Sequence, residues 1–158
     1  MRGSRIRRHT VTFALAPVAA LAVVTAADQP SVRRARVVAR DYAFEAPDTL
    51  PAGEVGFELE NRGARDHELI VGRLRPGATA GDIVAAHQRG IGLRQLQRAY
   101  LAEGAGGALL AQPGTRAGAR LVVPLARGQA YVLLCQLRDS AGMPQHAALG
   151  MFRLLHVR

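Results

Sequence analysis

The sequence has no lysine, no tryptophan, few aromatic residues and a single cysteine. All 21 basic residues are therefore arginines, and with 12 acidic residues they give a formal charge of +9. Proteins that bind single-stranded nucleic acids place aromatic side chains among basic ones so that bases stack on them. That interleaving is missing here. We expect a solvated basic surface, or a docking face for an acidic partner or an anionic membrane, and no nucleic-acid partner.

The single cysteine, Cys135, excludes an internal disulfide. In an oxidising compartment such a residue is buried and inert, is paired with another chain, or binds a ligand. Which of these three roles applies to Cys135 depends on the residues around it in the sequence.

The first 27 residues predict an export signal. Four arginines precede a stretch over residues 10–27 without charged side chains, and small residues before Asp28 offer a cleavage site. The alternative is an uncleaved membrane anchor, since about 18 apolar residues just span a bilayer. Cleavage leaves 17 arginines and 12 acidic residues, a charge of +5. We expect a polar lead over residues 28–35 and one domain over residues 36–158.

Short runs with period-two patterning and turn signals between them predict strands. In residues 53–63, Val55, Phe57 and Leu59 fall on one face and glutamates on the other. The run 66–74 keeps this period, so His67 begins a strand and points inward with Leu69 and Val71. The remaining predicted strands lie within 36–44, 119–128, 129–137 and 151–158.

A different period begins at Thr79. Apolar residues spaced for one face of a helix predict one or two short helices, broken near Gly90 and Gly92, within an insertion over residues 79–104. We interpret the glycine-rich run after Glu103 as a loop. Strands outnumber helices and short turns join them. The fold class that we expect is an all-β Greek-key sandwich with a short helical insertion.

Four candidate metal ligands converge at one end of such a sandwich. Cys135 ends a predicted strand, His146 and Met151 follow before the last strand, and the inward His67 begins another. A thiolate and two imidazoles with a weak thioether suit both Cu(I) and Cu(II), so little rearranges when an electron passes. The pattern therefore favours a copper site for electron transfer.

These residues resemble the copper loop of the cupredoxins, the blue copper proteins. The spacing from His146 to Met151 is similar to that of plastocyanin, "YVLLC" resembles the strand that delivers the cupredoxin cysteine, and "GMPQHAALGM" is similar to the longer loop of copper nitrite reductases. The resemblance covers residues 37–74 and 105–157. It implies His67, Cys135 and His146 as equatorial ligands of one type 1-like copper and Met151 as the axial ligand.

The resemblance also implies a function. We expect an exported, periplasmic or extracellular single-domain cupredoxin that carries electrons between partner proteins, with the edge of His146 facing the surface as the exit. An acidic redox partner would complement the arginine surface. One constellation is fewer than copper reductases and oxidases use, so we expect no enzyme. A copper-handling protein without a redox role and a metal-free interaction module are the alternatives.

The chain departs from the family in three places. Ten residues separate Cys135 from His146, a long and charged loop. Glu68 follows His67 where the family commonly has an asparagine that ties the ligand loops together, so a carboxylate near the metal is an alternative. Met143 is a rival thioether for Met151.

Each residue also has a structural interpretation. Cys135, His67 and Met151 taken singly fit a packed core. We expect His87 to be a partly exposed helical histidine, and His156, Tyr100 and Tyr131 to serve packing; none is counted as a ligand.

Overall fold

A computed structural model of the chain describes residues 32–158, apart from the side chains of residues 103–106. The predicted export signal over residues 1–27 lies outside the described residues, as do residues 28–31 of the predicted polar lead. Among the helices of residues 32–158, none combines the length and the apolar character needed to cross a bilayer.

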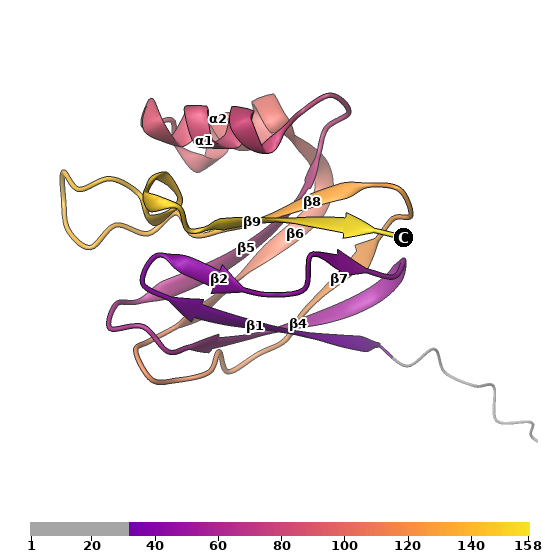
Figure 1. Cartoon of the computed structure of the whole chain (residues 1–158), viewed down its shortest axis with the longest axis horizontal. Coiled ribbons are helices and arrows are strands. Elements are labelled where there is room, and N and C mark those ends of the chain that lie inside the picture. Colours follow the sequence, from indigo (N-terminus) through magenta and orange to yellow (C-terminus); the bar gives the residue numbers. More distant parts are fainter. Residues whose placement is uncertain (1–31) are drawn as a thin grey trace, which may run out of the picture. The chain divides into compact units, whose positions relative to one another are not determined.

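Within residues 32–158, nine strands form two sheets that pack face to face (Figure 1). The first sheet has the order β2 (Ala43–Glu45), β1 (Arg33–Arg40), β4 (Gly53–Asn61), β7 (Leu121–Leu125). The second has the order β3 (Thr49–Leu50), β9 (Phe152–Val157), β8 (Ala130–Leu134), β5 (His67–Leu74), β6 (Leu101–Ala111). The all-β sandwich with a short helical insertion is confirmed. β1 begins at Arg33, three residues before the predicted strand.

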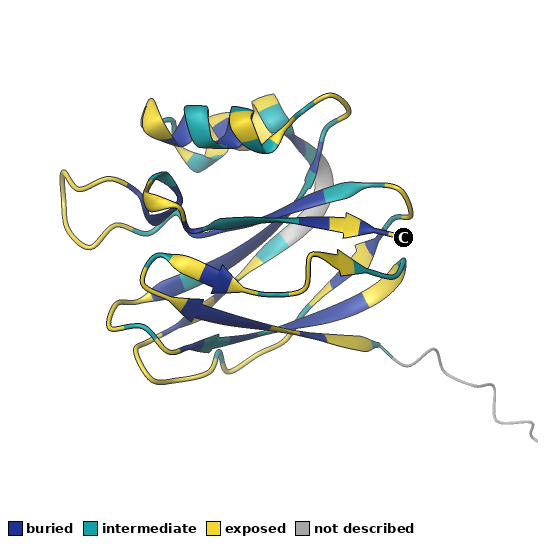
Figure 2. Cartoon of the chain, viewed as in Figure 1, coloured by how far each residue is buried: buried dark blue, intermediate teal, exposed yellow. Residues whose placement is uncertain are grey.

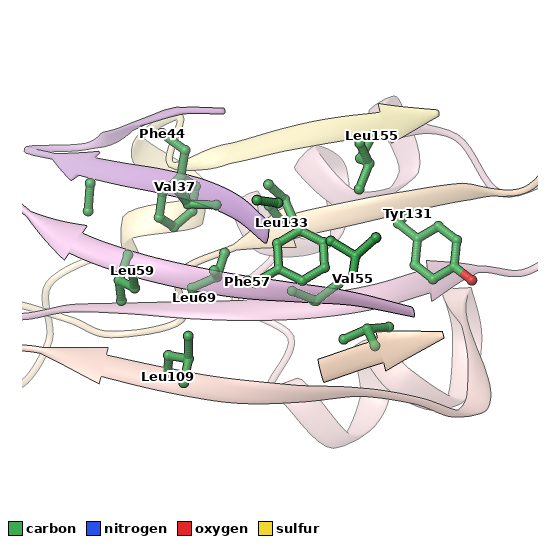
Figure 3. Packing of buried hydrophobic residues seen from close by; sticks show 14 of the residues in the cluster. Val37, Phe44, Val55, Phe57, Leu59, Leu69, Leu109, Tyr131, Leu133 and Leu155 are labelled. Carbon is green, nitrogen blue, oxygen red and sulfur yellow. The ribbon is translucent and has the colours of Figure 1, made fainter. Parts of the chain in front are cut away.

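The main core lies between the two sheets, where the period-two pattern places the apolar residues. Val55, Phe57 and Leu59 of β4 are buried, and they meet Leu133 and the fully buried Tyr131 of β8 (Figure 3). The predicted packing role of Tyr131 is thus confirmed. Burial runs through the middle of the strands and gives way to exposed side chains at the turns (Figure 2).

The predicted helices form as α1 (Ala80–Gln88) and α2 (Leu93–Tyr100). Thr79 and Asp82 make a reciprocal capping box that starts α1, and Gly90 takes a φ of 71° in the break between the helices. Both helices lie on the outer face of the second sheet (Figure 1). Ile83 and Leu96 of the helices pack there in a second buried cluster with residues of the sheet: Ile70, Leu74, Val132 and Leu134. Tyr100 packs against this cluster, as predicted for a packing residue.

Two predictions about these elements were wrong. The glycine-rich run expected as a loop is β6, a strand paired with β5, so the helical insertion ends at Tyr100. Gly107 lies in β6 at a position where a Cβ would meet the Leu121 side chain at 2.4 Å, so this glycine marks a close approach rather than a turn. His156, expected to pack, is exposed on β9.

Candidate metal centre

Three loops meet at one end of the sandwich: the β1–β2 turn, the β4–β5 loop and the long segment between β8 and β9 (Figure 1). They bring together His67, Cys135 and His146, whose ligand atoms all lie within 4.8 Å of one another. All three side chains are buried. The structure thus places three of the four predicted ligands in one cluster, although more than 60 residues of sequence separate the first from the other two.

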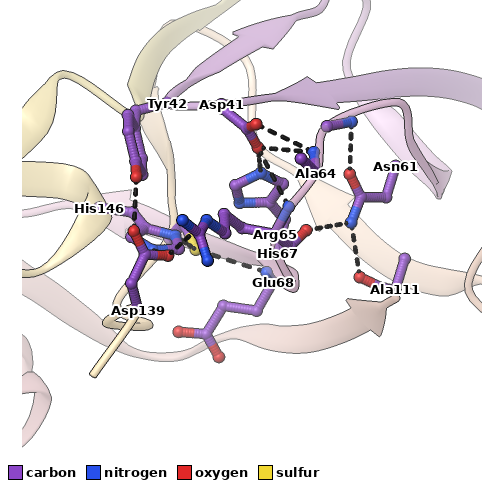
Figure 4. Close-up of polar contacts among 12 residues, drawn as sticks. Asp41, Tyr42, Asn61, Ala64, Arg65, His67, Glu68, Ala111, Asp139 and His146 are labelled. Atoms are coloured by element: carbon purple, nitrogen blue, oxygen red, sulfur yellow. Dashed lines mark hydrogen bonds and ion pairs between the residues drawn. The ribbon is translucent and has the colours of Figure 1, made fainter. Parts of the chain in front are cut away.

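His67 begins β5 and is completely buried, as predicted. Its Nε2 lies 2.8 Å from Oδ1 of Asp41, whose carboxylate also accepts the backbone N–H groups of Ala64 and Arg65 (Figure 4). These bonds, that of Ala64 foremost, lower the pKa of Asp41, so it stays ionised and accepts the Nε2 proton.

In the tautomer whose Nε2 donates to Asp41, the other nitrogen of His67, Nδ1, carries the lone pair. With the proton held on Nε2, Nδ1 is an acceptor, and it is buried with no hydrogen-bond partner among the described residues. An unpaired buried nitrogen is costly unless something binds it. A metal ion beside Cys135 and His146 would satisfy it, so the residues present fit the copper that the resemblance implies.

His146 opens a short 3-10 helix, η1 (His146–Leu149), and has the same arrangement. Its Nδ1 lies 3.4 Å from Sγ of Cys135, and its Nε2 lies 3.1 Å from Oδ1 of Asp139. Each histidine therefore turns Nδ1 to the centre and Nε2 to a carboxylate, the pairing that orients metal-binding imidazoles. The prediction that the edge of His146 faces the surface was wrong. The residue is 1% exposed, because Asp139 and the ring of Tyr42 lie over it.

Cys135 directly follows β8 and is fully buried. Its backbone N–H donates to Met151 and its carbonyl accepts from Ala147, which fixes the residue in the ligand loop. Burial raises the pKa of the thiol to about 11, so the metal-free protein holds a protonated sulfur at neutral pH. A bound metal requires the thiolate, and loading therefore releases one proton from this residue.

Glu68 connects the segments that carry His67 and Cys135. Its backbone N–H donates to Sγ of Cys135 at 3.4 Å, and its carboxylate accepts the backbone N–H of Gln136 at 2.8 Å. Burial raises the pKa of this carboxyl, and the Gln136 bond opposes the rise. The Glu68 carboxylate thus holds the two ligand segments together. This hydrogen bond to Gln136 engages one of its two oxygens, which then does not serve as a metal ligand.

The two candidate thioethers differ in burial. Met151 is fully buried in the main core, and its backbone bonds to both His146 and Cys135. Met143 lies in the loop with 46% of its surface exposed. Burial and position favour Met151, and its role as the axial ligand stays a prediction.

Sequence reasoning missed the residues that hold the first histidine. Asn61 is buried at the end of β4; its amide donates to the carbonyls of Arg65 and Ala111 and accepts from Gly63. These bonds shape the loop that leads to His67. The Asn-Arg-Gly sequence at residues 61–63 is typical only of a turn, and nothing in it indicates that Asp41, 26 residues upstream of His67, completes the arrangement.

The prediction that His87 is partly exposed was also wrong. It is 3% exposed, its Nδ1 bonds to the carbonyl of Ile83, and its Nε2 lies 3.1 Å from the amide of Gln136. Burial lowers its pKa, which favours the neutral ring. Gln136 in turn accepts from Gln145, so α1 is connected by hydrogen bonds to residues adjoining Cys135 and His146. The helical insertion therefore braces the ligand loop.

Gly63 leaves the space that Asp41 and His67 occupy. A Cβ at this position would lie 2.2 Å from Oδ1 of Asp41 and 2.8 Å from Nε2 of His67, closer than real contacts allow. We expect Gly63→Ala to cost about 1–3 kcal/mol in unfolding free energy by overpacking, and about tenfold in metal affinity through the displaced carboxylate. Urea unfolding and copper titration measure the two effects.

The control for this substitution is Gly118→Ala. A Cβ at Gly118 meets nothing within 4 Å, so we expect wild-type stability and affinity. Equal behaviour of the two variants would contradict the close packing around the Asp41 and His67 pair.

No protein-family model matches the chain, and no curated protein does. Solved structures match it. The reduced auracyanin of the photosynthetic bacterium Roseiflexus castenholzii is 16% identical over 81% of this chain and 98% of that one, with a TM-score of 0.50. Auracyanin B is 18% identical over 84% and 93% of the two chains, also with a TM-score of 0.50.

Auracyanin A of Chloroflexus aurantiacus, described as a blue copper protein, matches at 20% identity over 78% of this chain and 99% of that one, with a TM-score of 0.43. The two matches with a TM-score of 0.50 show that this chain has the cupredoxin fold of the auracyanins. The buried cluster of His67, Cys135 and His146 fits a single type 1 copper site. The predicted likeness of the ligand loop to that of nitrite reductases stays a prediction.

Proposed function

We propose that the chain is an exported single-domain cupredoxin that binds one copper ion at His67, Cys135 and His146, with Met151 as the axial ligand, and carries electrons between partners outside the cytoplasm. The observation that supports this most is the buried donor set, in which Nδ1 of His67, without a hydrogen-bond partner among residues 32–158, faces the same centre as the sulfur and the second imidazole. When bound at such a set, copper supplies a one-electron couple with little change in its coordination.

The chain's own residues support a carrier more than a copper-handling protein. Both imidazoles are held by carboxylates and the sulfur by a backbone N–H, and all three ligand residues are buried. Ligands held in this way stay in place whichever charge the site bears, which keeps reorganisation small. Release of the metal would require these bonds to break. That the chain is not an enzyme stays a prediction.

We propose an acidic protein as the redox partner. Arg34 and Arg36 of β1, and Arg116 in the segment before β7, have well-exposed side chains: they are 71%, 53% and 75% exposed. Glu58 and Glu60 pair with these and with Arg120, yet the arginines outnumber the glutamates. Complementary charge of this kind raises the rate of encounter with an acidic surface, and this rate enhancement falls with added salt.

Copper titration followed by voltammetry tests the function. We expect one equivalent of Cu(II) to produce an intense thiolate-to-copper band, and the loaded protein to show a reversible one-electron wave. A copper complex without a reversible wave would favour metal handling. If the protein shows no band and also does not bind Cu(I), the alternative that remains is a metal-free interaction module.

A further inference from the structure

Nε2 of His146, the ring nitrogen that faces away from the centre, is held by a pair of side chains. The three metal ligands do not need this pair in order to meet. Asp139 accepts from His146 Nε2 with Oδ1 at 3.1 Å and from the Tyr42 hydroxyl with Oδ2 at 2.5 Å. The Tyr42 ring meets the His146 ring edge-on, with centroids 5.0 Å apart. We call Tyr42 and Asp139 the clamp; Figure 4 shows both beside His146.

The clamp joins parts of the chain that lie far apart in the sequence. Tyr42 comes from the turn between β1 and β2 of the first sheet, and Asp139 comes from the loop between Cys135 and His146. Ten residues in that loop let it fold back so that Asp139 reaches the histidine at its end. The length and charge that set this loop apart from shorter copper loops thus have a structural use.

The charge of Asp139 is maintained by its neighbours. The Tyr42 hydroxyl foremost, and His146 and Arg65 besides, lower the pKa of Asp139, and Arg65 Nε lies 3.7 Å from its Oδ1. Only 15% of the Asp139 side chain is exposed. A carboxylate acceptor at Nε2 keeps the proton there and leaves the Nδ1 lone pair facing Cys135.

We propose that Asp139 is a positioning residue for His146, and that the clamp closes the centre so that reagents and partners reach it only when the clamp opens. The inference rests on the proposed copper function for its biological use. Its geometry concerns the protein alone, and so does its test.

Cys135 reports on opening, because it is the only cysteine and is fully buried. We expect Asp139→Ala and Tyr42→Ala to raise the rate at which iodoacetamide labels the metal-free protein by about tenfold or more, the factor for losing one hydrogen bond to a charged group. Tyr42→Phe keeps the ring and loses the hydroxyl, so its rate lies between those of the wild type and Tyr42→Ala. Urea unfolding of each variant separates local from global opening.

The matched control is Arg138→Ala. Arg138 is the neighbour of Asp139 in the same loop, and its guanidinium donates to the Met143 carbonyl. We expect wild-type labelling. Labelling as fast as in Asp139→Ala would indicate general loosening of the loop and overturn the clamp.

A second measurement addresses positioning. Nitrogen NMR of the metal-free protein reports which ring nitrogen of His146 holds the proton. We expect Nε2–H in the wild type and Arg138→Ala, and a mixture of tautomers in Asp139→Ala. Wild-type labelling and a wild-type tautomer in Asp139→Ala would overturn the inference. If Asp139→Ala does not fold, labelling of Tyr42→Phe at the wild-type rate overturns it. If the clamp variants behave as expected but the wild type binds no copper, the proposed function fails and the clamp stands.

Discussion

Replacing Cys135 by serine abolishes the intense visible band that we expect from the copper-loaded protein. The band needs a thiolate bound to copper, and Cys135 supplies the only thiol in the chain. A serine hydroxyl is a harder and far less acidic donor, so the two histidines are left to bind the ion with little help. The measurement is an absorption titration with Cu(II) to one equivalent, run beside the wild type.

Two methionine variants are the controls for this experiment. Met143→Leu removes an exposed thioether of the ligand loop, so we expect the wild-type band. Met151→Leu removes the buried thioether and keeps its volume, so we expect the band to remain but shift, with a changed potential. A band that survives Cys135→Ser would refute the assignment of the sulfur ligand. A shift in Met143→Leu but not in Met151→Leu would reverse the axial assignment.

Two of the three buried ligands of the centre, His67 and Cys135, were predictable because they coincide with strand ends. Period-two alternation placed His67 inward at the start of β5, and Cys135 follows directly after β8, where a long apolar run ends. Residues at the ends of neighbouring strands must lie close in space. His146 followed from its place in the same loop. Patterning is thus enough to locate these groups when a regular strand carries them.

The residues that orient these ligands were not predictable in the same way. Asp41 and Asp139 lie in irregular segments, and their contacts with His67 and His146 depend on how those loops fold back. No period constrains a loop, so nothing in the sequence distinguished them from solvated acids. The prediction that the edge of His146 is exposed was wrong for this reason, because it did not consider that the loop covers the ring. The prediction of a loop in place of β6 was wrong for a different reason: Gly107 marks a close approach to Leu121 rather than a turn.

Replacing Ile83 by alanine removes about 2–5 kcal/mol of unfolding free energy, the range for truncating a buried isoleucine. Ile83 has no exposed surface and lies in α1, against the outer face of the second sheet. If the helices were an appendage on a complete sandwich, the substitution would cost little. The second buried cluster joins α1 to β5 and β8 and includes Ala147 of η1, so unfolding the helices exposes the sheet and loosens the segment that carries His146.

Urea unfolding of the metal-free protein measures this loss, with Val84→Ala as the matched control. Val84 is the next residue of α1 and only partly buried, so its truncation removes fewer contacts and costs less. No metal ligand is altered in Ile83→Ala, and we expect the visible copper band of the folded variant to keep its position. Equal losses in the two variants would mean that α1 does not pack on the sheet as described, and the bracing of the ligand loop through His87 and Gln136 would fall with that packing.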